Sequence, residues 1–379
     1  MKKWIGALLA ALCMVTLLPV QAAAVELPLT SRAALLMEKT TGQILFAQNE
    51  HEALEPASVT KIMTLLLTMD AIDSGALAYD DVVTVSANAA GMGGSQVFLA
   101  EGEKITVEEL LKSVCVSSGN DAAVALAEKV AGVTELFVEQ MNNRAKGLGM
   151  DDTHFVNCTG LTAKGHVTSA YDIALMSREL LTRHPDIRRF TTIWTDTIRG
   201  GAFGLANTNK LIRFYEGATG LKTGSTDAAG YCLSATAERD GMELIAVIMK
   251  DATSAQRFED AKALLSYGFS TYTLKNVAPE TPLAPVPVTL GTQATVQPVL
   301  GEGTSLLLEK ARAGDLTQTV TLAESVPAPV EIGAKLGTLT VTSGEETVAE
   351  IPILAGEEVP RITYGQMLLR LLRLAFLSD

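Results

Sequence analysis

The stretch PASVTK, residues 56–61, stands directly before the apolar run IMTLLLTM, residues 62–69. If a helix begins here, Ser58 and Lys61 lie on the same face of it, one turn apart. Serine is also a common residue at a helix start, and about one SxxK match is expected by chance in a chain of this size. The question is whether Ser58 is a nucleophile activated by Lys61 or only the start of an ordinary helix.

The patterns around this stretch predict a mixture of strands and helices. Short strands are expected at Ala33–Glu38 and Gln43–Gln48, joined by a Thr-Gly turn, and a helix is expected at Ser58–Asp73. From there to about Arg183, apolar residues recur at spacings of three and four, which predicts several amphipathic helices.

Strand character returns after Gly220, in the runs GLKTGS, GYCLSATAER and MELIAVIMK. Asp240-Gly241 between the last two runs is a hairpin signal, and a final helix, SAQRFEDAKALLSYGF, follows. Strands at both ends with helices between them imply one antiparallel sheet with a helical insertion. We therefore expect an α/β (α+β) domain over residues 25–274.

Two further segments follow this domain. Residues 275–360 contain short β-type runs separated by Gly and Pro, which predicts a small all-β sandwich. Within residues 361–379, MLLRLLRLAFL would span about 16 Å as a helix, roughly half of a ~30 Å hydrocarbon core. Because Arg370 and Arg373 share one face and apolar residues cover most of the rest, we expect an amphipathic helix on a membrane surface. The alternative is a helix docked on the protein itself.

The N-terminus has the features of a secretory signal peptide over residues 1–24. Lys2 and Lys3 precede an apolar core at about Ile5–Leu18, and small residues then offer cleavage sites from Ala22 to Ala24. We therefore expect an exported protein whose net charge falls from −13 to −15 when the two lysines are removed. An uncleaved membrane anchor is the alternative.

Composition excludes several classes of function. The chain of 379 residues is 47% hydrophobic and 19% charged, which suits packed domains, and its net charge of −13 offers no basic surface for nucleic acid. Cys13 belongs to the signal peptide; Cys115, Cys158 and Cys232 have no CxxC spacing and are expected to be buried apolar residues. HExxH is also absent, so we expect no metal and no cofactor.

Nucleophilic chemistry at Ser58 would require Lys61 to be neutral, because an ammonium has no lone pair to accept a proton. A free lysine has a pKa of ~10.4, so only about one in 2,500 is neutral at pH 7. Burial and a second nearby cation are the physical means of lowering that pKa. Lys222 of Lys222-Thr223-Gly224, the single KTG in the chain, is a candidate for the second cation.

A third motif is Ser118-Gly119-Asn120, between two helical runs, where a short loop would aim a hydroxyl and an amide into a cleft. Ser86-Ala87-Asn88 also matches SxN, but it stands near a glycine-rich stretch and lies closer in sequence to Ser58. SxxK, SxN and KTG in this order form a joint signal that is typical of penicillin-binding proteins and class A β-lactamases.

The sequence resembles the low-molecular-mass penicillin-binding proteins that are serine-type D-alanyl-D-alanine carboxypeptidases. The resemblance rests on EPASVTKIMTLLL, GGSQVFLAEGEKITVEELLKSVCVSSGNDAAVALAE, HVTSAYDIALMSREL and TNKLIRFYEGATGLKTGSTDAAGYCLSATA, and it covers the chain from about Leu29 to its end. It implies a serine β-lactamase/transpeptidase-like fold for the first domain. One departure is Asn157–Leu161, where the family often has proline and histidine after the asparagine.

The resemblance implies a role for each motif residue. Ser58 would attack the carbonyl between two D-alanines of a peptidoglycan stem pentapeptide, and Lys61 would take its proton. Ser118 and Asn120 would relay protons and hold the peptide. Penicillin and other β-lactams would acylate Ser58 as covalent inhibitors.

Other implied contacts concern the substrate's carboxylate and the oxyanion. Lys222 and Thr223 would face the terminal carboxylate, and Gly224 would let the substrate approach the backbone. The backbone N–H groups of Ser58 and Ser225 would form the oxyanion hole. Arg257 is a weaker candidate for carboxylate binding, and its alternative is a solvated helical arginine.

Three rival functions are weighed against this one. A Ser-His-Asp triad is disfavoured because GxSxG is absent. A β-lactamase would need a deacylating glutamate, and no ExxLN-type motif supplies one. A non-catalytic penicillin-binding sensor or scaffold is disfavoured because all three motifs are intact.

Overall fold

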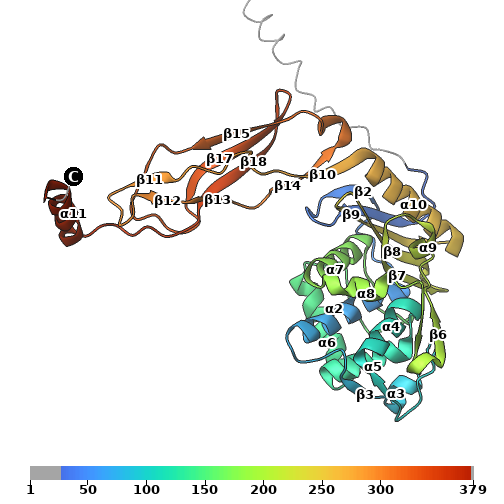
Figure 1. Cartoon of the computed structure of the whole chain (residues 1–379). Helices are drawn as coiled ribbons and strands as arrows, with labels where there is room; N and C mark the ends of the chain where they lie inside the picture. The colour runs from blue at the N-terminus through green and yellow to red at the C-terminus, as the bar shows by residue number, and fades with distance from the viewer. Residues whose placement is uncertain (1–26, 377–379) are drawn as a thin grey trace, which may run out of the picture.

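The structure is a computed structural model that describes residues 27–376, so the expected signal peptide lies outside the described residues. A globular N-terminal part is followed by an elongated β-rich part that points away from it, and helix α11 stands at the far end (Figure 1). We call these the catalytic domain, the β domain and the terminal helix.

The catalytic domain is built on one antiparallel sheet with the order β2-β1-β9-β8-β7. Its first two strands come from the start of the domain and its last three from the end, as the sequence predicts. Their bounds are β1 (Ala33–Glu38), β2 (Ile44–Gln48), β7 (Ala218–Thr226), β8 (Gly230–Arg239) and β9 (Met242–Asp251). β7 lies at one edge of the sheet, which leaves its outer side toward the helical insertion.

Helices cover both faces of this sheet (Figure 1). Alternate residues of β1 enter two different cores: Leu35 packs in the core under the helical insertion and Leu36 in the core under α10. The longer helices are α2 (Lys61–Asp73), α4 (Val107–Ser117), α5 (Asn120–Ala131), α6 (Thr134–Gly147), α7 (Ala170–Arg183) and α10 (Ser254–Thr271). The shorter elements are β3 (Val82–Thr84), α3 (Ala87–Ala90), β4 (Lys104–Thr106), η2 (Pro185–Ile187), α8 (Arg188–Thr191), β5 (Thr195–Ile198), η3 (Arg199–Gly201), β6 (Phe203–Ala206) and α9 (Leu211–Phe214).

The helix that follows the SxxK motif differs in detail from the prediction. A 3₁₀ turn, η1 (Ala57–Thr60), comes first, and α2 begins only at Lys61. The run 61–69 is buried at every position, so α2 has no solvent face until its last turn, residues 70–73. Tertiary packing on all sides explains why an almost uniformly apolar run forms a helix here.

The β domain begins with β10 (Tyr272–Asn276), which starts just before the predicted boundary and pairs with β14. A four-stranded sheet, β13-β18-β17-β15, and a three-stranded sheet, β12-β11-β16, follow. Two small apolar cores lie in this domain. The bounds are β11 (Val286–Thr289), β12 (Thr295–Val296), β13 (Pro298–Leu300), β14 (Ser305–Glu309), η4 (Lys310–Arg312), β15 (Leu316–Leu322), β16 (Val326–Pro327), β17 (Lys335–Ser343) and β18 (Glu346–Ala355).

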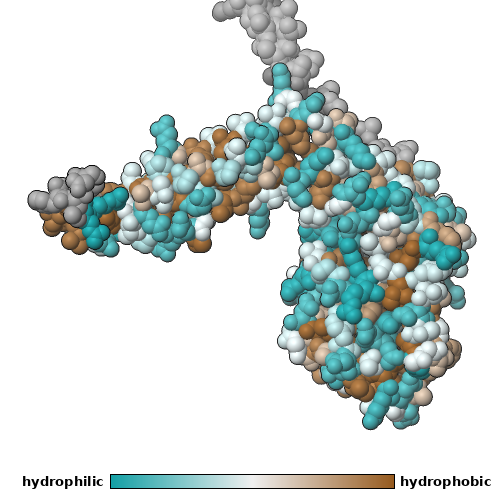
Figure 2. Space-filling model, in the orientation of Figure 1, coloured by the Kyte–Doolittle hydropathy of each residue, from teal (hydrophilic) through white to brown (hydrophobic). Residues whose placement is uncertain are grey.

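The terminal helix α11 spans Tyr364–Phe376. At ~1.5 Å per residue it is shorter than a bilayer core is thick, and across residues 27–376 we find no helix that is long and apolar enough to cross one. Its leucines are largely exposed: Leu368, Leu369, Leu371 and Leu372. Figure 2 shows hydrophobic surface at the tip of the molecule, where Figure 1 places α11.

Candidate active site

Ser58 and Lys61 meet at the junction of η1 and α2. The Lys61 Nζ lies 2.9 Å from the Ser58 Oγ, 2.6 Å from the Asn120 Oδ1 and 2.7 Å from the Thr159 carbonyl oxygen. Lys61 is fully buried, whereas Ser58 is half-buried. The nucleophile candidate is therefore open to a substrate while the base candidate is shielded from water.

This coordination of Lys61 accommodates an ammonium or a neutral amine. An ammonium would donate one N–H to each of the three oxygens, whereas a neutral amine has two N–H donors and one lone pair. The Asn120 Oδ1 and the Thr159 carbonyl oxygen can only accept, so they take both remaining donors. The lone pair is then left for the Ser58 hydroxyl, which is the arrangement that proton abstraction from Ser58 requires.

The electrostatic environment favours the neutral form. Burial lowers the pKa of Lys61 well below its usual value, and the charge of Lys222 lowers it further. Burial also lowers the pKa of Lys222, to about 7, and Arg257 adds to that effect. Both of the physical means expected from the sequence, burial and a second cation, are therefore present.

Ser118 and Asn120 flank Gly119 between α4 and α5. Ser118 ends α4 in the left-handed conformation, with φ of 61°, and its Oγ accepts a hydrogen bond of 2.9 Å from the Lys222 Nζ. Asn120 starts α5, and its Nδ2 donates to the Gly93 carbonyl oxygen at 2.7 Å while its Oδ1 accepts from Lys61. The SxN motif thus contacts the lysines of both other motifs.

The KTG motif lies in the middle of β7 rather than at its start. The Thr223 Oγ1 lies 2.7 Å from the Thr208 Oγ1, which belongs to none of the three motifs. Gly224 packs against η1, the turn that carries Ser58 and that we call the nucleophile turn. A Cβ added to Gly224 would lie 2.8 Å from the Pro56 carbonyl oxygen and 2.9 Å from the Ser58 backbone nitrogen. The close approach that requires glycine is therefore made by the chain's own backbone.

Ser225 and Arg257 complete the set of predicted site residues. Ser225 is exposed at the end of the motif. Arg257 is buried, so the interpretation as a solvated helical arginine is wrong. Its guanidinium donates to the carbonyl oxygens of Gly224 at 3.0 Å and Cys232 at 3.3 Å, which ties α10 to the KTG strand.

The loop Asn157–Leu161 was not predicted to belong to the site. Its Thr159 carbonyl binds Lys61, and the Asn157 Oδ1 holds the loop by accepting from the backbone N–H groups of Thr159 and Gly160. Gly160 lies against the nucleophile turn, because a Cβ there would come within 1.8 Å of the Ala57 carbonyl oxygen. A backbone carbonyl leaves no signal in the sequence, because every residue has one. The only sequence signal of this loop was its asparagine and glycine.

The competing SxN match at Ser86–Asn88 and the cysteines make other contacts. Ser86 caps the short helix α3 and Asn88 donates to Glu128, so neither approaches Ser58 through these contacts. The three cysteines of the described chain are free and buried, as predicted. Burial raises the pKa of both Cys115 and Cys158 to about 12, so neither is a ready thiolate. Within residues 27–376 no cluster of three or more acidic, histidine or cysteine side chains could hold a metal.

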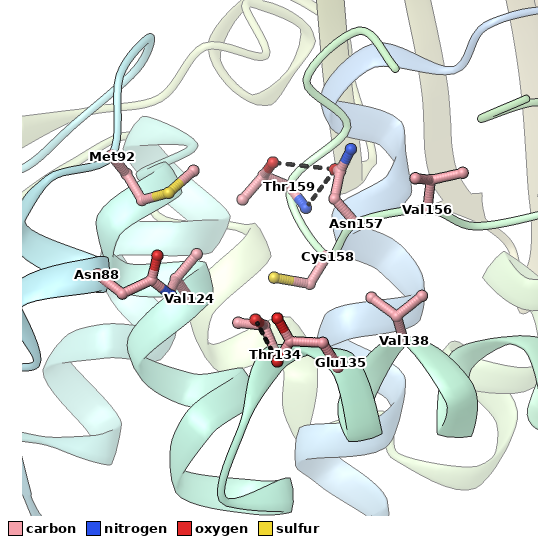
Figure 3. Close-up of a pocket in the computed structure, with 10 residues that line it drawn as sticks. All are labelled: Asn88, Met92, Val124, Thr134, Glu135, Val138, Val156, Asn157, Cys158 and Thr159. Carbon is pink, nitrogen blue, oxygen red and sulfur yellow. Dashed lines mark hydrogen bonds between the residues drawn. The ribbon is translucent and has the colours of Figure 1, made fainter. Parts of the chain in front are cut away.

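A pocket of about 340 Å³ lies behind the 157–161 loop, and Cys158 points into it (Figure 3). Asn157, Cys158 and Thr159 form one wall, with side chains of α5 and α6 opposite. Ser58, Lys61, Ser118, Asn120 and residues 222–224 do not line this pocket. The loop therefore separates it from Lys61.

Comparisons with known proteins agree with this geometry. A profile described as D-alanyl-D-alanine carboxypeptidase matches residues 20–253, and one described as the C-terminal domain of penicillin-binding protein 5 matches residues 272–361. The D-alanyl-D-alanine carboxypeptidase DacF of Bacillus subtilis is 41% identical over 91% of this chain and 90% of its own length. DacD of Escherichia coli is 34% identical over 86% of each.

Solved structures share the architecture over two thirds to nine tenths of the chain. Penicillin-binding protein 5 from Haemophilus influenzae superposes with a TM-score of 0.78 at 27% identity, over 89% of this chain and 99% of that one. Penicillin-binding protein D2 from Listeria monocytogenes, solved in an ampicillin-bound form, superposes with a TM-score of 0.60 at 33% identity over 65% of this chain and 100% of its own.

The fold and the site define a serine peptidase of the penicillin-binding class. The chain belongs to the D-alanyl-D-alanine carboxypeptidase family. The predicted family, its penicillin-binding fold and its serine hydrolase class are thereby confirmed.

Proposed function

We propose that this chain removes the terminal D-alanine from peptidoglycan stem pentapeptides through an acyl-enzyme on Ser58, and that β-lactams acylate the same oxygen. Lys61 accepts the Ser58 proton as the Oγ attacks the carbonyl. The bond to the leaving D-alanine then breaks as Ser118 passes its hydroxyl proton to the departing amine and regains the proton that Lys61 accepted, so both side chains return to their starting forms. Water then attacks the acyl carbon: its hydroxyl stays on the released tetrapeptide as the new carboxyl group, and its other hydrogen returns to the Ser58 Oγ.

In this proposal the remaining site residues bind the substrate and stabilise the oxyanion. Lys222 and Thr223 bind the terminal carboxylate of the substrate. The backbone N–H groups of Ser58 and Ser225 stabilise the oxyanion, and Arg257 acts through the Gly224 carbonyl that it holds. Asn120 orients both Lys61 and the peptide.

One observation carries the proposal: the fully buried Lys61 amine lies 2.9 Å from the Ser58 hydroxyl while two oxygens that can only accept take its other hydrogens. Intact-mass analysis after incubation with penicillin tests it. We expect an adduct on the wild-type chain and none on Ser58→Ala. An adduct that persists on Ser58→Ala would overturn the proposal.

A β-lactamase and a non-catalytic sensor would also form that adduct, so product analysis must follow. Pentapeptide incubated with the protein should yield tetrapeptide and one D-alanine, seen by mass spectrometry, while penicillin turns over slowly. Rapid penicillin turnover without D-alanine release would indicate a β-lactamase. A stable adduct without any peptide product would indicate a sensor or scaffold.

We also propose an exported enzyme held at the outer face of the cytoplasmic membrane. The signal-peptide pattern of residues 1–24 and the exposed leucines of α11 support this location. The β domain, which separates α11 from the catalytic domain (Figure 1), would then hold the active site away from the bilayer and toward the cell wall.

A further inference from the structure

His166 is buried beside the active site, and the reaction proposed above does not use it. It precedes α7, is 2% exposed, and both of its ring nitrogens are engaged. The Val156 backbone N–H donates to the His166 Nδ1 at 2.9 Å, and the Nε2 lies 2.8 Å from the Thr60 Oγ1.

These contacts determine which nitrogen carries the proton. Because the Val156 N–H can only donate, the His166 Nδ1 must accept, and the ring proton of the neutral form resides on Nε2. The Nε2–H therefore donates to the Thr60 Oγ1, whose own hydrogen is donated to the Ala57 carbonyl oxygen at 2.8 Å. Burial lowers the pKa of His166 to about 4, so the ring is neutral at pH 7.

The two bonds of His166 lead to two different contacts of Lys61. Through Thr60 and Ala57, the ring holds the turn that carries Ser58. Through Val156, it holds the segment that ends at Thr159, whose carbonyl binds the Lys61 Nζ. One rigid ring thus sets the separation between the nucleophile turn and the loop that orients the base.

The turn needs such support, because Ala57 is held in the left-handed region with φ of 48°. A non-glycine residue in that region is strained and persists only when its surroundings hold it. Gly160 packs directly against the Ala57 carbonyl, so the turn and the loop can shift only together. His166 hydrogen-bonds to the turn at Thr60 and to Val156, the residue directly before the loop.

We propose that His166 is a positioning residue for acylation: it holds the Ser58 turn and the Thr159 carbonyl at the separation that proton transfer to Lys61 requires. This inference rests on the proposed function of Ser58 and Lys61. It assigns no proton transfer to His166 itself.

Two near-isosteric substitutions separate the two halves of this role. In His166→Asn the amide oxygen occupies the place of Nδ1 and keeps the Val156 bond. In His166→Gln the amide nitrogen reaches the place of Nε2 and keeps the Thr60 bond. His166→Ala removes both, Thr60→Val breaks the second bond from the other side, and Thr60→Ser retains it.

The measurement is stopped-flow acylation by a fluorescent penicillin at pH 7, which resolves the non-covalent dissociation constant from the first-order acylation constant of the bound complex. We expect His166→Ala and Thr60→Val to lower the acylation constant by roughly 10–100-fold, as misplacement of reacting groups does, with little change in the dissociation constant. His166→Asn, His166→Gln and Thr60→Ser should each recover part of the loss. The matched control is His154→Gln, because His154 is exposed on the neighbouring strand bridge.

A purely structural role would give a different result. It would lower the melting temperature and leave the acylation constant of the folded complex unchanged. If all the His166 and Thr60 variants acylate at the wild-type rate once bound, the positioning role is overturned, whatever their stability. A wild-type chain that forms no adduct at all would instead overturn the proposed function, so the two failures are distinguishable.

Discussion

The catalytic domain and the β domain differ in whether they bury charged side chains. Lys61, Lys222, Arg257 and Glu243 are all buried in the catalytic domain. Among the described residues of the β domain, by contrast, every residue in the buried class is apolar. Burying a charge is costly unless it is compensated, whereas burying an aliphatic side chain stabilises the fold. Glu243 is compensated by ion pairs with Lys39 and Arg188, whereas Lys61 and Lys222 are buried without an acidic partner among residues 27–376, which indicates that the catalytic domain keeps these two amines for chemistry.

The two domains also differ in backbone strain near functional groups. Ala57 and Ser118, which both adjoin motif side chains, have positive φ values of 48° and 61°. In the β domain, Leu290 is the one non-glycine residue of this kind among the described residues, and it lies in a turn beside the terminal helix. Strain that adjoins reactive side chains is consistent with a preorganised site.

The largest effect should come from removing the buried amine of Lys61. Lys61→Ala should lower the acylation constant for penicillin by about 10²–10⁴-fold, because positioned proton transfer contributes that much. Stopped-flow fluorescence measures the rate, and circular dichroism checks the fold. Lys164→Ala, at an exposed lysine beyond the 157–161 loop, is the matched control. Near-normal acylation by a folded Lys61→Ala chain would remove the base from the mechanism.

A matched pair of core truncations tests whether the two domains are separate units of stability. Leu66 in α2 and Ile353 in β18 are both fully buried. Leu66→Ala and Ile353→Ala should each lower the free energy of unfolding of their own domain by about 2–5 kcal/mol. Urea titrations followed by penicillin acylation should show an earlier midpoint for Leu66→Ala only. An equal shift for Ile353→Ala would show that the domains unfold as one unit.

Much of the fold was predictable because its patterns are local. The strand pair at the start, the hairpin at Asp240-Gly241 and the terminal helix follow from period, turn residues and amphipathicity. The 3₁₀ turn before α2 was missed because Ala57, with its strained φ, packs against Gly160, a tertiary contact from a distant segment of the chain. Propensity alone does not report such contacts.

The parts of the candidate site that side chains form were predictable from the sequence. The parts that backbone groups form were not. Ser58, Lys61, Ser118 and Lys222 came from motifs whose residue types the chemistry requires. The Thr159 carbonyl was missed because any residue supplies one. The burial of Arg257 was left open because helical periodicity does not say which of two sheet faces a helix covers.

The next effect concerns the terminal helix, where exposed apolar residues contrast with the closed cores of both domains. Leu368 and Leu372 lie four residues apart on one face and are 59% and 44% exposed. If α11 lies in a membrane interface, Leu368→Asp and Leu372→Asp should each weaken partitioning onto anionic liposomes by roughly 10–150-fold, the loss of about 1.5–3 kcal/mol of leucine burial. Sedimentation at low and high salt measures it.

The control for this test is Val320→Asp, which places the same charge on an exposed valine of β15. It should sediment with liposomes as the unchanged chain does. A chain that ends at Pro360 should remain in the supernatant and keep its activity on small peptides. If truncated and full-length chains partition alike, α11 is not the anchor.

The smallest expected effect concerns Lys222, the second buried lysine of the site, and its influence on the pKa of Lys61. Lys61 must be neutral to accept a proton, so acylation is lost as pH falls through the pKa of Lys61. The charge of Lys222 lowers that pKa. Lys222→Met should therefore raise the pKa of Lys61 and move the acid limb of the acylation profile to higher pH, with a change within about tenfold at any one pH on that limb. Weaker carboxylate binding lowers the whole profile but does not move its limb.

Lys210→Met, at an exposed lysine of the same domain, should leave the limb in place. A limb that stays fixed or moves to lower pH in Lys222→Met would show that Lys222 serves substrate binding alone, and that burial by itself keeps Lys61 neutral.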